Sequence, residues 1–245
     1  PWRLALARFA ANRAALAGVA LLLAITAFAF LAPLLSPHDM EANDWELIQA
    51  APTLAQSHWF GTDANGRDLF VRVAAGARVS LAIGLITTLV SVVIGVLYGA
   101  IAGYVGGRVD QAMMRLVDVL YALPLFFAII ILVTVFGRNI FLVFLAIGAV
   151  EWLTIARIVR GQTLAAKQME YVEAARSLGA PASRIVLRHI VPNVVGPVIV
   201  FSTLLVPTVI LVESFLSFLG LGVQEPQTSW GLLISQGTAS LDSAP

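Results

Sequence analysis

The sequence predicts an all-α protein whose helices cross a membrane several times. Hydrophobic side chains make up 59% of the 245 residues, charged side chains make up only 12%, and the mean hydropathy is +0.90. Soluble domains carry roughly a quarter charged residues, so the expected solvent is a lipid bilayer. Helices are expected there because a helix satisfies its own backbone hydrogen bonds without water.

Five stretches are long and apolar enough to cross the hydrocarbon core, which takes about 20 residues. The first follows three arginines and is too long for the apolar part of a signal peptide, so we interpret it as an uncleaved anchor. Arg138 and Asn139 are expected to form a tight turn between the third and fourth stretches. The five predicted spans cover approximately residues 14–35, 79–104, 116–136, 140–158 and 194–219.

The basic residues are distributed unevenly between the segments that connect these spans. Excess Lys and Arg stays on the cytoplasmic side of a membrane, which predicts a cytoplasmic N-terminus. Four basic residues then lie outside: Arg67, Arg72, Arg78 and Arg138. Eleven lie inside: Arg3, Arg8, Arg13, Arg108, Arg115, Arg157, Arg160, Lys167, Arg176, Arg184 and Arg188.

Several classes of chemistry lack support in the sequence. The chain has no cysteine, which excludes disulfides and thiolate metal sites. Its histidines, His38, His58 and His189, are too scattered to suggest a zinc site, and no metal-binding cluster is predicted. The single lysine, Lys167, follows two alanines, so no phosphate-binding G-x-x-x-x-G-K-[ST] loop exists. The nucleophile motif G-x-S-x-G is also absent.

The predicted cytoplasmic segment between the fourth and fifth spans is organised as two helices. Residues 161–192 read GQTLAAKQMEYVEAARSLGAPASRIVLRHIVP. Strong helix formers predict one helix over residues 164–178, and Gly179 suits the position just after its end. Pro181 suits the first turn of a second helix. A helix–turn–helix on the cytoplasmic face indicates a protein that is moved by a cytoplasmic partner.

Three sequence blocks resemble a known family. The pattern in the cytoplasmic segment resembles the E-A-A loop of permease subunits of binding-protein-dependent ABC importers, and its matching residues are Glu173, Ala174, Ala175, Gly179 and Pro192. His189 and Val191 depart from the Ile and Leu of the general pattern. The blocks RHIVPN, FGTDANGRDLFVRVAAGARVSL and ESFLSFLGLGVQEPQTSWG, at 188–193, 60–81 and 213–231, resemble the dipeptide and oligopeptide branch. This resemblance indicates a C-type permease subunit of a dipeptide, oligopeptide or nickel importer.

The resemblance implies the type I importer permease fold and a set of partners. A sister permease subunit would complete a heterodimer, two ATPase subunits would bind ATP and Mg²⁺, and a periplasmic or extracellular binding protein would deliver the solute. The chain itself would be a non-enzymatic subunit in a bacterial inner membrane, with no catalytic, metal or cofactor site. The positions expected to contact an ATPase subunit are Glu173, Ala174, Ala175, Gly179 and Pro192.

Four functional segments follow from the spans and the resemblance together. Residues 1–35 are predicted to hold the cytoplasmic N-terminal segment and the first span, and residues 36–78 a periplasmic loop. Residues 79–219 are the permease core, with the coupling loop at 161–192. Residues 220–245 are a periplasmic segment that leads to a last helix, because the family implies a sixth span in the intact protein.

Two alternatives remain open at this point. Glu151 and Glu213 lie within or at the ends of spans, where a carboxylate indicates function by default. They could serve a proton-coupled secondary transporter, although a structural hydrogen bond is the simpler interpretation for both. The other alternative is a permease specific for nickel. The acids Asp110 and Asp118 are interpreted as local partners of Arg108 and Arg115, or as solvated and interfacial residues.

Overall fold

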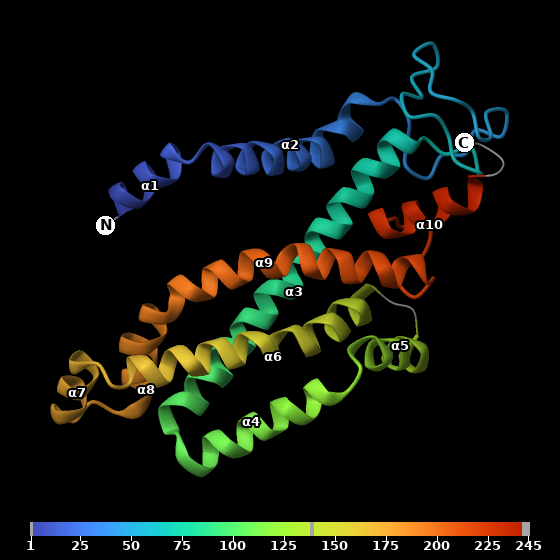
Figure 1. Ribbon diagram of the computed structural model, residues 1–245. Helices are drawn as coiled ribbons and strands as arrows, with labels where there is room; N and C mark the ends of the chain where they lie inside the picture. The colour runs from blue at the N-terminus through green and yellow to red at the C-terminus, as the bar shows by residue number, and fades with distance from the viewer. Residues whose placement is uncertain (1, 138–139, 242–245) are drawn as a thin grey trace. The chain divides into compact units, whose positions relative to one another are not determined.

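The computed structural model describes residues 2–137 and 140–241, and most of these residues are helical (Figure 1). The all-α prediction is confirmed, because the β contacts in the described residues are two isolated bridges. The helices are α1 (Trp2–Ala11), α2 (Arg13–Leu35), α3 (Leu69–Val105), α4 (Gly107–Ala122), α5 (Leu125–Phe136), α6 (Ile140–Ala166), α7 (Glu170–Ser177), α8 (Ala182–Ile185), the π-helical turn η1 (Val186–Ile190), α9 (Val191–Phe218) and α10 (Trp230–Ser240).

Three helices in the described ranges are long and apolar enough to cross a membrane. They are α2, α3 and the continuous helix formed by α8, η1 and α9, which runs from Ala182 to Phe218. The pair α4 and α5 makes a fourth if a bent pair counts as one span. The predicted span at 140–158 lies within α6, while the turn expected at Arg138 and Asn139 falls outside the described residues.

The third predicted span is not one helix, which corrects the expectation for residues 116–136. α4 ends at Ala122 and α5 begins at Leu125, and the two helices meet at an angle of 80°. Pro124 explains the break, because proline forces the preceding residue out of the helical region. Leu123 accordingly has φ −72° and ψ 133°, which is extended backbone.

The chain divides into two compact units, residues 1–81 with 224–245 and residues 82–223. In the first unit, the loop between α2 and α3 packs its aromatic side chains on the start of α3. Phe70 meets Trp59 and Phe60 edge to face, with ring centroids 4.6 and 5.2 Å apart. The helix α10 belongs to this unit and begins at the side-chain cap of Ser229. None of the five predicted spans covers α10.

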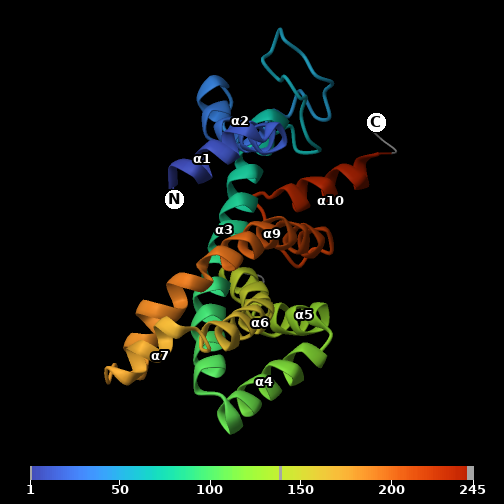
Figure 2. The same cartoon turned by 60° about the vertical axis from the view of Figure 1, so that its left-hand side comes forward.

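The second unit is built around α6 and α9, which lie side by side (Figures 1 and 2). α3 also packs closely on α6, through a ridge of small residues formed by Gly95, Gly99 and Gly103 at a spacing of four residues. A Cβ atom at Gly95 would lie 2.6 Å from Cβ of Ile155, and one at Gly103 would lie 2.8 Å from Cβ of Thr163. At Gly99 a Cβ would collide with the backbone carbonyl of Ala156. The ridge therefore brings the backbones of α3 and α6 into close contact.

Candidate functional site

The coupling loop, residues 161–192, contains the two helical segments that the sequence predicted, although the first one is interrupted. α6 extends to Ala166, and α7 begins only at Glu170, so residues 164–178 are not one helix. The amides of Gln168 and Met169 bond to carbonyls three residues back, which closes the end of α6. A separate short helix, α7, therefore stands between α6 and α8.

The end of α7 is fixed by a complete Schellman motif at Gly179. The amide of Gly179 donates to the carbonyl of Arg176 over 3.0 Å, and the amide of Ala180 donates to the carbonyl of Ala175 over 3.1 Å. Gly179 has φ +75°, in the left-handed region that favours glycine. The space around its Cα is open, so glycine is required here by backbone conformation and not by crowding.

The second half of the loop is continuous with a membrane-spanning helix. Pro181 lies at the N-cap position of α8, directly before the first turn in which the sequence placed it. The π-helical turn η1 precedes Pro192, a residue that cannot donate a backbone hydrogen bond. The side-chain amide of Asn193 donates to the carbonyl of His189 over 2.6 Å. Through this turn the loop passes directly into α9.

Most of the predicted docking positions lie on the surface. Glu173, Ala174, Gly179 and Pro192 are exposed. Ala175 differs, because it is only 9% exposed and lies with the fully buried Val172 on the inner face of α7. α7 packs on α8 and η1, so the side chain of Ala175 contributes to packing within the loop and not to an outward contact surface.

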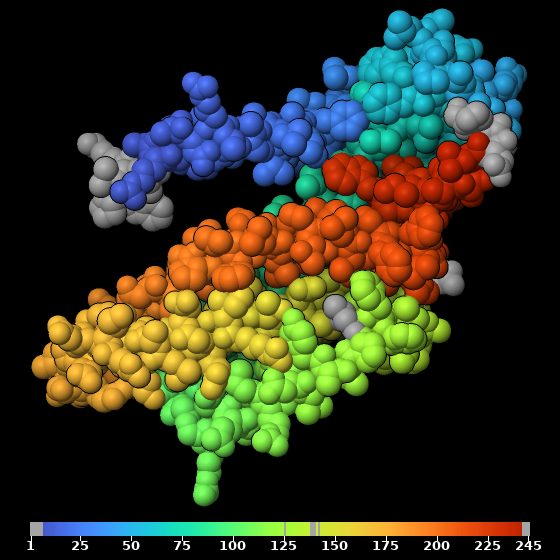
Figure 3. Space-filling view, viewed as in Figure 1, coloured from blue at the N-terminus to red at the C-terminus, as the bar shows by residue number. Residues whose placement is uncertain are grey.

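The exposed face of α7 also presents apolar side chains that the sequence analysis missed. Tyr171 is 40% exposed, Leu178 is 88% exposed, and Ala174 lies between them at helical spacing. Glu173 adds a carboxylate beside this stripe. We call Tyr171, Glu173, Ala174 and Leu178 the α7 surface. In the space-filling view the yellow-to-orange segment that contains α7 lies at one end of the second unit (Figure 3). The detectable signal was an apolar i, i+3, i+7 stripe next to the buried Val172 and Ala175.

Basic side chains fasten the coupling loop to the end of α3. The ammonium group of Lys167 donates to the backbone carbonyl of Tyr104 over 2.6 Å. A cation at the C-terminus of a helix is favourable because the last carbonyls carry partial negative charge. Lys167 and Arg176 also lie 5.6 and 6.0 Å from the centroid of the Tyr104 ring. Arg176 therefore connects α7 to the end of α3, and Lys167 connects the segment between α6 and α7 to the same place.

Two ion pairs join α4 to α6. They correct the interpretation of Asp110 as a solvated partner of Arg108, while Asp118 is exposed, although its partner is Arg157 and not Arg115. Asp110 is buried and receives two hydrogen bonds from Arg160, of 2.5 and 2.6 Å. Asp118 accepts a hydrogen bond of 2.7 Å from Arg157, whose guanidinium also lies over the ring of Tyr121. Neither carboxylate pairs with the nearby Arg108 or Arg115 in these contacts. The two pairs therefore hold α4 against the helix that leads into the coupling loop.

The two carboxylates of the predicted spans have different surroundings. Glu213 is fully buried, and one of its oxygens accepts a hydrogen bond of 2.7 Å from the hydroxyl of Ser217 in the same helix. This contact agrees with a structural role. Glu151 lines a cavity of about 310 Å³ at the break between α4 and α5, together with Tyr121 and Thr154. The hydroxyls of Tyr121 and Thr154 lie 3.1 Å apart.

The block at residues 60–81 forms a charged network in the first unit. Arg67 donates to Asp63 and to Glu225 over 2.8 and 2.9 Å, while the buried Arg72 pairs with Asp63. Arg72 also donates to the side chain of Gln236 over 3.1 Å. The hydrogen bond from Arg67 holds the pKa of the Glu225 carboxyl below its usual value. These residues join the loop to α10, so we assign them a structural role.

Comparison with known proteins places this arrangement in a family. The family described as "Binding-protein-dependent transport system inner membrane component" matches residues 95–243, which include the coupling loop. The family described as "N-terminal TM domain of oligopeptide transport permease C" matches residues 1–52. The second match covers the N-terminal part of the chain, and the first covers the C-terminal part.

Individual relatives extend the similarity along the whole chain. The oligopeptide transport system permease protein OppC of Escherichia coli K12 is 55% identical over 244 residues, which are 100% of this chain and 81% of that protein. OppC of Bacillus subtilis is 43% identical over 100% of this chain and 79% of its own length. The dipeptide transport system permease protein DppC of Bacillus subtilis is 42% identical over 98% of this chain and 73% of its own length.

These matches confirm the family that the three sequence blocks indicated. They agree with the helical architecture and the apolar spans. The chain therefore belongs to the inner-membrane components of binding-protein-dependent ABC transport systems, within the C-type oligopeptide permeases.

Proposed function

We propose that this chain forms one half of a transmembrane path through which dipeptides or oligopeptides are imported. The observation that carries the proposal is 55% identity over the full chain to an oligopeptide transport permease. Relatives named for oligopeptide and dipeptide transport support peptides as the substrate class. A nickel-specific permease and a proton-coupled carrier have no comparable support.

The α7 surface is the proposed contact for an ATPase subunit. Its apolar stripe, Tyr171, Ala174 and Leu178, offers side chains that a partner groove can remove from water. Glu173 offers a carboxylate for a charge-assisted hydrogen bond to a basic side chain of the partner. Gly179 and Pro192 define the two ends of the rigid segment behind this surface. ATP and Mg²⁺ would be held by the partner, and the free energy for transport would come from there.

Movement of α7 would reach the membrane-spanning helices through contacts already described. α8 leads without interruption into α9, and Lys167 connects the loop to the end of α3. The pair of Asp110 and Arg160 adds α4 to the helices that would move together. ATP-driven closure of two ATPase subunits would thus move the spans as rigid bodies and change which side of the membrane has access to the path.

The remaining assignments complete the proposal. The N-terminus lies in the cytoplasm, as the distribution of Arg and Lys indicates, and the coupling loop lies on the same side. Residues 36–78 and 220–245 lie outside, where a binding protein would deliver the peptide. A sister permease subunit forms the other half of the path. The chain itself performs no ATP hydrolysis.

Reconstituted vesicles provide the test. The chain, its sister subunit, the ATPase subunits and the binding protein are incorporated together, and uptake of a labelled tripeptide is measured with and without ATP. The proposal expects uptake only when ATP and the ATPase subunits are both present. Unchanged uptake without ATP, or uptake driven by a pH gradient alone, would contradict it.

A further inference from the structure

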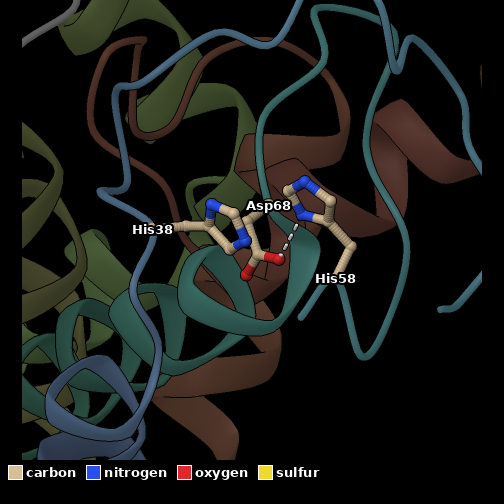
Figure 4. Close-up of side chains that lie close together, drawn as sticks. All are labelled: His38, His58 and Asp68. Atoms are coloured by element: carbon tan, nitrogen blue, oxygen red, sulfur yellow. Dashed lines mark hydrogen bonds and ion pairs between the residues drawn. The ribbon is translucent and has the colours of Figure 1, made fainter. Parts of the chain in front are cut away.

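Two histidines that are twenty residues apart in the sequence lie together in the first unit. The rings of His38 and His58 stack with their centroids 4.0 Å apart and their planes 13° apart. Asp68 lies beside them, and Nδ1 of His58 is 2.8 Å from Oδ2 of Asp68 (Figure 4). The expectation that the histidines are too scattered to lie together is therefore wrong for this pair.

Nearby hydrogen bonds hold the backbone around each member of this cluster. The amide of His38 donates a hydrogen bond to the hydroxyl oxygen of Ser36. The carbonyl of His58 accepts hydrogen bonds from the amides of Thr53 and Gly61. Asp68 precedes α3, and its Oδ1 accepts a hydrogen bond of 2.8 Å from the amide of Val71. Three separate segments thus meet in a fixed arrangement before any ligand binds.

Two of the three side chains in the cluster are almost completely buried, which is unusual for ionisable groups. His58 is 2% exposed and Asp68 is 1% exposed, while His38 is partly exposed. One potential ligand atom from each residue lies within 4.8 Å of those of the other two. Partial exposure of His38 leaves a way in from solvent, and the burial of the other two residues shields a bound ion from exchange.

We propose that His38, His58 and Asp68 bind a divalent transition-metal ion, with Zn²⁺ as the preferred species. Two imidazole nitrogens and one carboxylate oxygen are ligands that Zn²⁺ accepts in tetrahedral sites, and water can occupy the fourth position. Mg²⁺ and Ca²⁺ are disfavoured because they require mainly oxygen ligands. The ion would link the segment that follows α2 to the start of α3.

Binding requires a small adjustment centred on His38. Zinc bonds of about 2.0–2.1 Å bring neighbouring ligand atoms closer together than 4.8 Å. His58 and Asp68 are already within hydrogen-bond distance of each other. Nε2 of His38 lies 2.9 Å from the carbonyl oxygen of Gln56, and the partly exposed ring can exchange this contact for the ion or keep it while Nδ1 coordinates.

A zinc titration tests the proposal independently of transport. The full chain is purified in detergent without a polyhistidine tag, stripped with a chelator, and titrated with Zn²⁺ by calorimetry. His38→Gln removes the most exposed ligand, and His189→Gln serves as the matched control because it removes a histidine from the coupling loop. We expect one Zn²⁺ per chain in the unaltered protein and in His189→Gln, with at least tenfold weaker binding in His38→Gln.

Thermal unfolding distinguishes loss of a ligand from loss of the fold. Without metal, His38→Gln and the unaltered chain are expected to unfold at similar temperatures. Added Zn²⁺ should raise the unfolding temperature of the unaltered chain and leave that of His38→Gln unchanged. The proposal is overturned if the unaltered chain fails to bind Zn²⁺, or if His38→Gln binds it equally well. The absorption of tetrahedral Co²⁺, used as a substitute ion, reports the same site spectroscopically.

Discussion

Arg160 on α6 holds Asp110 on α4 through two hydrogen bonds, with Nε 2.5 Å from Oδ1 and Nη2 2.6 Å from Oδ2. The side chain of Asp110 is only 10% exposed, whereas that of Arg160 is 35% exposed. This paired geometry is the strongest type of ion pair that side chains form. It joins two helices that are fifty residues apart in the sequence, at the end of α6 that leads into the coupling loop.

Removing the arginine should leave a buried carboxylate without its partner. Arg160→Met is expected to destabilise the protein by about 2 kcal/mol, which is less than a fully buried pair would lose because Arg160 is partly exposed. The double substitution Asp110→Asn with Arg160→Met should recover part of this loss. Unfolding temperatures in detergent measure both effects. Equal stability of the single variant and the unaltered chain would show that the ion pair does not hold α4.

Close packing of α3 on α6 predicts opposite outcomes for two glycines in helices. A Cβ at Gly99 would collide with the backbone of α6, while nothing lies within 4 Å of the position at Gly161. Gly99→Ala should therefore cost about 1–3 kcal/mol through overpacking. Gly161→Ala, the matched control, should gain up to about 1 kcal/mol from helix propensity. Gly99→Ala should therefore unfold at a lower temperature than Gly161→Ala. The reverse order would contradict the close packing of α3 on α6.

The turn at Gly179 predicts a difference between alanine and asparagine. Gly179→Ala must adopt a positive φ, at a cost of about 1–2 kcal/mol. Gly179→Asn should cost less, because asparagine tolerates this conformation. Amide hydrogen exchange across residues 170–178 is expected to accelerate in the alanine variant and much less in the asparagine variant. If the two variants exchange equally fast, backbone conformation is not what requires glycine here.

The proposed orientation can be mapped with single cysteines, because the chain has none of its own. Leu54 is 86% exposed in the predicted outer loop, and Leu178 is 88% exposed in the coupling loop. A membrane-impermeant maleimide should label Leu54→Cys in intact spheroplasts. It should label Leu178→Cys only after the membrane is permeabilised. The opposite pattern would reverse the assigned topology.

Local patterns in the sequence predicted the main helices because each of these helices depends on nearby residues. Long apolar runs predicted the membrane helices, and Gly179 with Pro181 predicted the turn between α7 and α8. Pro124 is the sequence feature that marks the break between α4 and α5, but it did not by itself predict that break. A proline inside an apolar run is compatible with one continuous span, and only the extended conformation of Leu123 distinguishes a break. The short helix α10 lacked the length of a membrane span.

The remaining features depend on residues that are distant in sequence. The pairing of Asp110 with Arg160 and the meeting of His38 with His58 require the fold, and spacing along the chain gives no indication of them. Ala175 and Ala174 are adjacent, yet only the packing of α7 on α8 and η1 determines which one faces outward. The E-A-A pattern therefore located the candidate docking segment, while the structure identified Tyr171 and Leu178 as further members of its surface.

Cross-linking from Leu178 tests most directly whether the α7 surface contacts the ATPase. Leu178→Cys is placed in the assembled transporter with a short cysteine-reactive photo-cross-linker, and Leu211→Cys, which is 70% exposed on α9, serves as the control. During ATP hydrolysis, the account predicts a cross-link to an ATPase subunit from position 178 and none from position 211. An actively transporting complex that gives no ATPase cross-link from position 178 would contradict it.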